Sequence, residues 1–394
     1  MSSLTSGLKR ETWLPYGRQW IDEADIQAVT AVLRSDYLTT GPKIEAFESK
    51  LARQVGAKYA VAFANGTAAL HGACCAAGIG PGDEVITSPL TFAASANCVL
   101  YQQATPVFAD IDASTYNLDP AKTAELINSR TKAIIPVDFT GQPADLRTIR
   151  ALAHEHGLLV IEDAAHALGA FYEGEPVGGI SDMTMFSLHP VKHITSGEGG
   201  IITTNSEDLY EKLLQFRCHG IVRERAKLIH EAHGPWYHEM QSLGYNYRMT
   251  DLQAALAESQ LEKLPMFVAK RREIATQYDE AFGAMKVLQI PWQSSEGVSS
   301  WHLYVIQLRL EQLSAGRKQI FEELIALNIG VNVHYIPVYY HPYYEQLGYS
   351  RGLCPQAERL YERILTLPLF PAMTAADVRD VIAAVKGVTE RYAC

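Results

Sequence analysis

Lys192 lies in the stretch FSLHPVKHITSGEGG (residues 186–200), which places a cation directly after an apolar run. The run 183–188 is typical of a buried strand, and a second apolar run begins at Ile201. A lysine that is desolvated near other cations loses proton affinity, and its neutral amine is a nucleophile that forms Schiff bases. The alternative interpretation is a solvated lysine in a turn.

Two further segments offer groups that suit a phosphate. Asn65, Gly66 and Thr67 stand between an apolar run and a helical pattern, and free N–H groups at a helix start bind anions. An ordinary N-cap is the alternative there. Ser187, five residues before Lys192, offers a hydroxyl, or it is a solvent-facing strand end. Neither a Walker A loop nor a G-x-G-x-x-G motif is present, so binding of a nucleoside triphosphate or a dinucleotide is not favoured.

An acid and an aromatic side chain also follow apolar runs. Asp163 ends the run in VIEDAAHALGA, where it could bind a metal, cap a turn or pair with a cationic ring. His166 follows three residues later, on the same side if the turn is helical. Phe92 in TSPLTFAASAN is either plain core or a stacking face for a flat ligand. Together these groups match pyridoxal 5′-phosphate, which needs a phosphate cradle, a stacking face, a carboxylate for its ring nitrogen and an amine for its aldehyde.

The elements that must position these residues alternate between strands and helices. Such alternation favours βαβ units and a mainly parallel sheet, whose ligands bind outside the carboxyl ends of the strands. The expected strands are residues 59–64, 84–88, 105–111, 133–139, 158–163, 183–188 and 199–205. The expected helices between and around them are residues 22–36, 43–56, a segment from Thr67, a segment after Thr91, and residues 119–129, 144–157 and 206–220.

The C-terminal part has a different pattern. Two long helices are expected over residues 251–282, then strands over 301–310 and 329–338 and helices over 314–327 and 375–388. We therefore predict a large domain over residues 1–270 and a smaller α+β domain over residues 271–394. The length of 394 residues agrees with two domains.

The composition narrows the function classes. A net charge of −10 argues against nucleic acid or an anionic membrane as the main partner. The six cysteines lack metal-pair spacing, and His154 and His156 face different sides of a predicted helix, so no metal site is expected. The first residues show no apolar export signal, and no run of about 18 apolar residues spans a membrane. The expectation is a soluble cytoplasmic protein.

The chain resembles the DegT/DnrJ/EryC1/StrS family of fold-type I pyridoxal-phosphate enzymes, the sugar aminotransferases. The resemblance runs nearly end to end and is carried by LPYGRQWIDEADIQAV, LTTGPKIEAFE, NGTAAL, GDEVITSPLTFAASAN, TPVFADID, IEDAAHALGA, FSLHPVKHITSGEGG, GYNYRMTDLQAAL, WHLYVI and HYIPVYYHPYY. It implies an α/β fold-type I aminotransferase with a mainly parallel seven-stranded sheet and a smaller α+β C-terminal domain. Gly66 and Asn65 differ from the Ser-Ala-Thr or Ser-Gly-Thr of relatives, a change that backbone N–H groups tolerate.

The resemblance also implies residue roles. Lys192 would hold pyridoxal phosphate covalently and shuttle a proton, and Asp163 would pair with the pyridine nitrogen. His166 would lie near the ring hydroxyl, and Phe92 against the ring. The residues implied in phosphate binding are Gly66, Thr67, Ala68, Ser187 and, from the neighbouring subunit of a homodimer with shared active sites, Asn246. By position, Tyr16 and His334 are candidate sugar contacts, and the alternative for His334 is the end of a core strand.

The reaction implied is transfer of an amino group from L-glutamate, through pyridoxamine phosphate, to a keto group of a nucleotide-linked sugar. The similarity is greatest to the branch that aminates C4 of UDP-linked 4-keto-hexoses. Within that branch it is greatest to the pseudaminic acid pathway, where the substrate is UDP-2-acetamido-2,6-dideoxy-β-L-arabino-hexos-4-ulose. The alternative is C4 or C3 amination of another UDP-, dTDP- or GDP-linked keto-sugar, of the 4-amino-arabinose, perosamine or bacillosamine type. A 3-dehydratase would carry histidine in place of Lys192. A non-catalytic cofactor-binding protein is the remaining alternative, and a regulator would need a DNA-binding module for which the chain has no room.

Overall fold

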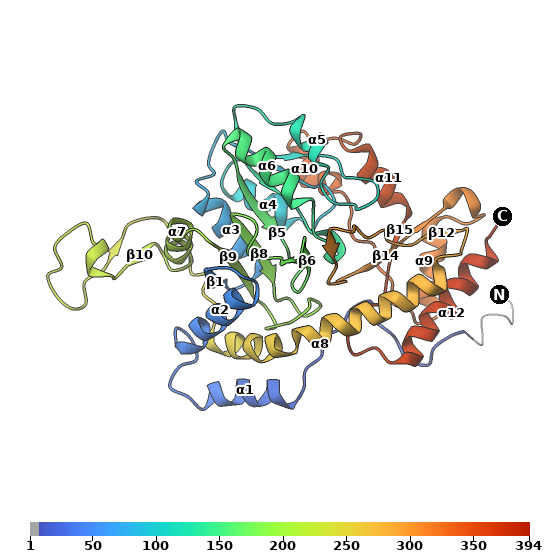
Figure 1. Cartoon of the computed structure of the whole chain (residues 1–394), viewed down its shortest axis with the longest axis horizontal. Coiled ribbons are helices and arrows are strands. Elements are labelled where there is room, and N and C mark those ends of the chain that lie inside the picture. Colours follow the sequence, from blue (N-terminus) through green and yellow to red (C-terminus); the bar gives the residue numbers. More distant parts are fainter. Residues whose placement is uncertain (1–7) are drawn as a thin grey trace.

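A computed structural model describes residues 8–394 and contains a central seven-stranded sheet (Figure 1). Its strands are β1 (Tyr59–Phe63), β2 (Glu84–Thr87), β3 (Thr105–Phe108), β4 (Thr131–Ile135), β5 (Leu159–Asp163), β8 (Met183–Ser187) and β9 (Gly200–Thr204). The strand order is β1-β9-β8-β5-β4-β2-β3, and β9 alone runs antiparallel to its neighbours β1 and β8. The predicted mainly parallel seven-stranded sheet is confirmed.

Helices cover both faces of this sheet, and alternate side chains of each strand pack against one helix layer or the other. In β1, Val61 and Phe63 pack with one helix layer, whereas Ala60 and Ala62 pack with the other. The first layer consists of α3 (Gly66–Ala76), α4 (Ala94–Tyr101) and α7 (Glu207–Arg217). The second layer consists of α2 (Pro42–Gln54), α6 (Leu146–His156) and the first half of α8 (Asp251–Phe282). The strands are therefore buried on both sides, which is typical of parallel sheets.

The C-terminal part forms its own apolar cluster around a small antiparallel sheet. That sheet has the order β12-β14-β15, with β12 (Leu288–Gln289), β14 (Tyr304–Leu308) and β15 (Ile364–Leu367). It packs with α9 (Arg317–Ala326), α12 (Ala375–Arg391) and the second half of α8. Leu14, from the start of the described chain, lies in the same cluster and bridges Ile329.

Shorter elements complete the described chain. They are α1 (Glu23–Leu33), α5 (Pro120–Ala124), α10 (Pro342–Gln346), α11 (Pro355–Arg363), the short strands β6 (Phe171–Tyr172), β7 (Glu175–Pro176), β10 (Ile221–Val222), β11 (Glu239–Met240) and β13 (Gly297–Val298), and the 3-10 turns η1 (Phe139–Gly141), η2 (Arg225–Lys227), η3 (Leu310–Gln312) and η4 (Val338–Tyr340). Over residues 8–394, no helix combines the length and apolar character needed to cross a membrane.

Residues 251–282 form one helix where the sequence predicted two. Pro265 lies inside α8 and removes one backbone hydrogen bond, yet the helix continues because Phe267, Val268 and Ile274 are buried on its packed side. The helix passes residue 270 without a break, so the proposed division at 270/271 stays a prediction. Residues 329–338 were predicted as a strand but make only isolated bridges, through Ile329 and Asn332.

An extended arm leaves the body of the molecule between α7 and α8 (Figure 1). It covers residues 218–245 and contains the two-stranded ribbon β10–β11. Several large apolar side chains of the arm are exposed, namely Ile229, Trp236, Met240, Leu243 and Tyr245. Exposed apolar side chains gathered on one segment are typical of a protein–protein contact.

Candidate active site

The predicted site residues gather where β5 and β8 end. These neighbouring strands run parallel, with Asp163 opposite Met185, so Asp163 and Ser187 leave the sheet at the same edge. The loop after β8 then turns back into β9, and the N–H of Lys192 donates to the carbonyl of His189 (2.9 Å). The sheet thereby positions a carboxylate, a hydroxyl and an amine at one edge, as the sequence predicted.

The Lys192 amine lies in a buried environment. Burial, which is opposed by the charge of Asp163 and assisted by that of Arg271, lowers its pKa to about 8. Its Nζ lies 3.4 Å from Nε2 of His302. A fraction of this amine is therefore neutral near pH 7 to 8, which a nucleophilic lysine requires.

The Asp163 carboxylate is held by two donors. The Ser95 hydroxyl donates to Oδ2 (2.6 Å), and the N–H of Ala165 donates to Oδ1 (3.1 Å). Burial raises the pKa of Asp163, while Ser95, Ala165 and Lys192 pull it down. A buried carboxylate with donors already in place is suited to pairing with a cationic ring nitrogen.

Three buried histidines surround the amine, two of which the sequence analysis left without a role. His302 lies 4.3 Å from His166 and 5.6 Å from His193, measured between ring centroids. Burial is the main cause that lowers the pKa of all three, and the Lys192 charge adds to it. These rings are consequently neutral at physiological pH. Across residues 8–394, no group of three His, Cys, Asp or Glu side chains is arranged to hold a metal.

Polar contacts made by Nε2 hold two of these rings, those of His166 and His193, in place. The Nε2 atom of His166 lies 3.1 Å from the Tyr335 hydroxyl, and that of His193 lies 3.1 Å from the Ser300 carbonyl. The Nδ1 atoms of His166, His193 and His302 are buried without a partner in the described chain. Buried polar atoms are rarely left unpaired, so these atoms mark a place where a polar ligand fits.

Arg271 pins the lysine loop to the C-terminal part of the chain. It is buried in α8 and donates to the carbonyls of Leu369 (2.9 Å), His302 (3.1 Å) and Val191 (3.4 Å). Burial lowers its pKa to about 9. The guanidinium thus connects the residue before Lys192 with the segment that carries His302.

Gly66 and Ser187, two of the residues predicted to bind phosphate, also lie side by side. An atom added as Cβ at Gly66 would lie 3.4 Å from Cβ and 3.5 Å from Oγ of Ser187, so glycine leaves the space between them open. At the start of α3, the Asn65 side chain accepts a hydrogen bond from the N–H of Ala68 (2.8 Å). The backbone carbonyl of Asn65 accepts one from the N–H of Ala69. The N–H groups of Gly66 and Thr67 precede Ala69, the first N–H that donates within the helix, and are left for a ligand. This cradle fits a phosphate group.

The remaining predicted residues lie around these groups. Phe92 is 64% exposed, and its ring lies 6.4 Å from that of Tyr335, which leaves a face open for stacking. Tyr16 and His334 contact each other at 5.2 Å between ring centroids. Burial, followed by the Lys192 charge, lowers the pKa of His334 to about 3. Asn246 is exposed at the base of the arm, where it bridges Cys218.

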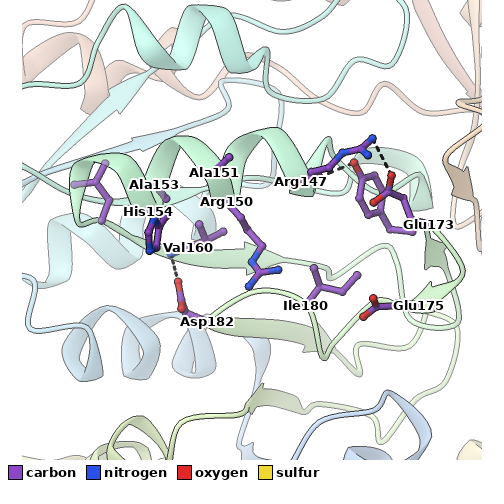
Figure 2. A pocket seen from close by; sticks show the side chains of 12 residues that line it. Arg147, Arg150, Ala151, Ala153, His154, Val160, Glu173, Glu175, Ile180 and Asp182 are labelled. Atoms are coloured by element: carbon purple, nitrogen blue, oxygen red, sulfur yellow. Dashed lines mark hydrogen bonds and ion pairs between the residues drawn. The ribbon is translucent and has the colours of Figure 1, made fainter.

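A separate cavity of 440 Å³ lies away from these residues (Figure 2). It opens between α6 and the turn that holds β6 and β7, and Arg150 points into it. Arg147 at its edge pairs with Glu173 (2.8 Å). None of the predicted site residues lines this cavity, so it is distinct from the site at Lys192.

Comparison with known proteins agrees with this geometry. The sequence profile of the DegT/DnrJ/EryC1/StrS aminotransferase family matches residues 19–386. The chain belongs to this family. The spore coat polysaccharide biosynthesis protein SpsC of Bacillus subtilis is 45% identical over 384 residues, covering 97% of this chain and 98% of SpsC.

Solved structures of the family superimpose over nearly the whole chain. PseC of Helicobacter pylori, an aminotransferase involved in the biosynthesis of pseudaminic acid, has a TM-score of 0.89 at 33% identity and covers 97% of this chain and 100% of its own. The putative sugar aminotransferase Spr1654 of Streptococcus pneumoniae, in its PMP form, has a TM-score of 0.90 at 31% identity and covers 96% and 99%. Another structure of Spr1654 is a PLP form. The fold-type I expectation is therefore confirmed, and this chain is a sugar aminotransferase of the DegT/DnrJ/EryC1/StrS family.

Proposed function

We propose that this family member transfers the amino group of L-glutamate to C4 of a UDP-linked 4-keto-6-deoxy-hexose, with pyridoxal phosphate held covalently on Lys192. The acceptor proposed is UDP-2-acetamido-2,6-dideoxy-β-L-arabino-hexos-4-ulose, which gives a 4-amino sugar for pseudaminic acid or another surface glycan. The observation that carries the proposal is the buried Lys192 amine, which shares one sheet edge with the Asp163 carboxylate and the Gly66–Ser187 cradle. The likeness to PseC supports the acceptor.

The residues of this chain divide the work of holding the cofactor. Gly66, Thr67 and Ser187 would hold the phosphate, Phe92 would offer a stacking face, and Asp163 would pair with the ring nitrogen. Ala68 was predicted to bind the phosphate as well, but its N–H already donates to the Asn65 side chain. His166 would lie beside the ring hydroxyl. When bound, the cofactor supplies an aldehyde for the amine and a ring that withdraws electrons.

Lys192 is also proposed to give up and take back a proton during the reaction. Because its pKa is about 8, Nζ can release a proton and accept one again near neutral pH, as an acid–base group must. His302 lies 3.4 Å from Nζ and holds the free amine within the site. Arg271 fixes the loop through the Val191 carbonyl, which limits how far the amine can move.

The acceptor sugar is proposed to lie against Tyr16 and His334. These rings come from segments 318 residues apart and meet near Lys192, whose charge acts on His334. Aromatic rings commonly bind the apolar faces of sugars. The 45% identity to SpsC favours a second candidate, namely C4 or C3 amination of a different UDP-, dTDP- or GDP-linked keto-sugar for a surface polysaccharide.

We infer a homodimer whose subunits share their active sites. The exposed apolar residues of the arm supply a contact surface, and Asn246 stands exposed at its base. Asn246 would reach the phosphate bound by the partner. This arrangement agrees with the family resemblance of GYNYRM, the motif that contains Asn246.

A trapping experiment tests the cofactor assignment. Borohydride reduction of the purified protein with bound cofactor, followed by peptide mapping, should find the cofactor on Lys192 alone. Attachment to any other lysine would overturn the assignment.

A substrate panel then tests the reaction. The protein is incubated with L-glutamate and UDP-, dTDP- and GDP-linked 4-keto sugars, and the products are identified by mass spectrometry and NMR. The proposal expects a 4-amino product from the UDP-linked sugar. Activity with only dTDP- or GDP-linked sugars would replace the acceptor and keep the reaction class.

A further inference from the structure

Two buried carboxyl groups lie behind the cofactor-facing edge of the sheet. Asp138 follows β4, and Glu162 is the penultimate residue of β5; neither has any exposed surface. Side chains alternate along β5, so Glu162 faces the α6 layer together with Val160, whereas Asp163 faces the α3 and α4 layer. No role in the proposed reaction accounts for this pair.

Each carboxyl has one oxygen bound by a donor and one that is not. The N–H of Ala144 donates to Oδ1 of Asp138 (2.9 Å), and the Thr184 hydroxyl donates to Oε2 of Glu162 (2.8 Å). Oδ2 of Asp138 and Oε1 of Glu162 have no hydrogen-bond partner in the described chain. The parallel bridge between Val137 and Asp163 places the side chains of Asp138 and Glu162 on the same face of the sheet, so the two unpartnered oxygens belong to neighbouring side chains. Ionised carboxylates only accept hydrogen bonds, so a bond between these two oxygens would require a proton.

The same segment holds the backbone of Asp163. The N–H of Asp163 donates to the carbonyl of Pro136 (2.9 Å), and the N–H of Asp138 donates to the carbonyl of Asp163 (3.1 Å). Val137 and Asp163 form a parallel bridge between these bonds. Both polar backbone atoms of Asp163 are thus bound by the segment that Asp138 ends.

We propose that Asp138 is protonated at neutral pH and donates to Glu162, and that this carboxyl pair is a positioning device for Asp163. The side-chain bond closes residues 136–138 onto β5 from the α6 side and keeps the Asp163 carboxylate directed at the cofactor site. This inference rests on the proposed role of Asp163 as the partner of the cofactor ring.

The surrounding charges keep the proton on Asp138. Burial is the main cause that raises its pKa, and the negative charges of Glu162 and Asp163 add to it. Burial also raises the pKa of Glu162, whereas Asp138, the Thr184 hydroxyl and the charge of Arg150 favour its ionised form. The pair therefore carries one negative charge instead of two.

Two substitutions separate the bond from the charge. Asp138→Asn keeps a donor toward Glu162, whereas Asp138→Leu keeps the approximate volume and removes the donor. We expect the affinity of the apoprotein for pyridoxal phosphate to stay within about twofold in the Asn variant and to fall about tenfold or more in the Leu variant, which corresponds to ~1.4 kcal/mol. Equal losses in both variants, or none in the Leu variant, would overturn the proposal.

Infrared spectroscopy of the apoprotein observes the proton directly. The spectrum of the wild type minus that of Asp138→Asn should contain the C=O band of a protonated carboxylic acid at neutral pH. Absence of this band would refute the protonated pair. Glu162→Gln serves as a second variant: its amide donates to an ionised Asp138, so the acid band should disappear while cofactor affinity stays within a few-fold of the wild type.

The pH dependence of stability gives an independent readout. Because folding raises the pKa of Asp138, the wild type loses stability as pH rises from the usual carboxyl range toward the folded pKa. Asp138→Asn lacks this loss, so its melting temperature should rise relative to that of the wild type between pH 5 and 9. A constant difference over this range would contradict the proposal.

Asp163→Asn distinguishes failure of this proposal from failure of the proposed cofactor role. If Asp163→Asn binds pyridoxal phosphate as well as the wild type, the role of Asp163 is wrong, and the infrared band still decides whether the carboxyl pair holds a proton.

Discussion

Lys192 has its unusual properties because the fold removes water from an amine that remains close to another cation. Burial and Arg271 favour the neutral amine, while Asp163 favours the charged form. The result is an amine whose pKa of about 8 lies near physiological pH. The lowered pKa of Lys192 arises from protein groups alone, in β5, the loop after β8 and α8. It can therefore be tested in the protein without cofactor.

Replacing Lys192 with methionine should stabilise the apoprotein at neutral pH. The folded pKa of Lys192 lies below its unfolded value, so the wild type loses stability as pH falls through about 8. We expect Lys192→Met to be more stable at pH 7 by up to about 3 kcal/mol, with the difference shrinking toward pH 10. Urea denaturation of both apoproteins measures this difference. Lys132→Met, at an exposed lysine, is the control, and an advantage that does not change with pH would contradict the explanation.

His302 should set how readily the amine loses its proton. Its neutral Nε2 can accept a hydrogen bond from the Lys192 ammonium, which stabilises the charged form. In His302→Leu, the pKa of Lys192 should fall further, and the pH profile of cofactor uptake should shift down by about one pH unit, or ~1.4 kcal/mol. The rate of covalent pyridoxal-phosphate uptake measured against pH checks this shift. His302→Gln, which keeps an acceptor, should shift the profile less, and an unchanged profile in the Leu variant would show that His302 only packs.

Among the elements, α3 links helix stability to phosphate binding through its N-cap. Asn65 holds the N–H of Ala68 and orders the first turn, in which Gly66 and Thr67 present their N–H groups. Asn65→Ala should cost about 1 kcal/mol of stability and also weaken the binding of pyridoxal phosphate. Thermal melts and cofactor titration measure the two effects.

Ser206→Ala provides the matched control. Ser206 caps α7 in the same way, by accepting from the N–H of Leu209 (3.3 Å), but lies in no part of the candidate site. It should lose similar stability and retain cofactor affinity. If both variants lost affinity equally, the N-cap of α3 would have no special part in phosphate binding.

The sequence predicted the elements that carry local signals. Asp163 and Ser187 each follow an apolar strand, and parallel neighbours bring the ends of such strands to one edge, so this part of the site followed from the pattern. His302 and Arg271 carry no such signal, because only tertiary packing brings residues 110 and 79 positions beyond Lys192 back to it. The continuation of α8 through Pro265 also could not be predicted, because it depends on the burial of neighbouring residues and not on local helix propensity.

On the scale of the whole molecule, the proposed sharing of sites between subunits can be tested by complementation. Lys192→Ala and Asn246→Ala should each be inactive as homodimers. After mixing and exchange of subunits, a heterodimer would contain one intact site, so activity should return to up to about a quarter of the wild-type value. The rate of amino transfer from L-glutamate measures this recovery.

Lys192→Ala mixed with Asp163→Ala is the control for that experiment. Both residues are contributed by the same subunit to one site, so no combination of these subunits has an intact site. Recovery in this control, or none with Asn246→Ala, would show that Asn246 does not act across the interface.

The position of Leu14 in the C-terminal cluster has a consequence for biosynthesis. Leu14 belongs to the same apolar cluster as residues as distant as Val388 and bridges Ile329, so this cluster joins the beginning of the described chain to its end. On the ribosome, the seven-stranded sheet can form once β9 has emerged, but Ile329, the bridge partner of Leu14, is synthesised 315 residues after Leu14, at about 5–20 residues per second. Throughout that interval Leu14 has no native partner, and this segment is where a chaperone would find a binding site on the nascent chain.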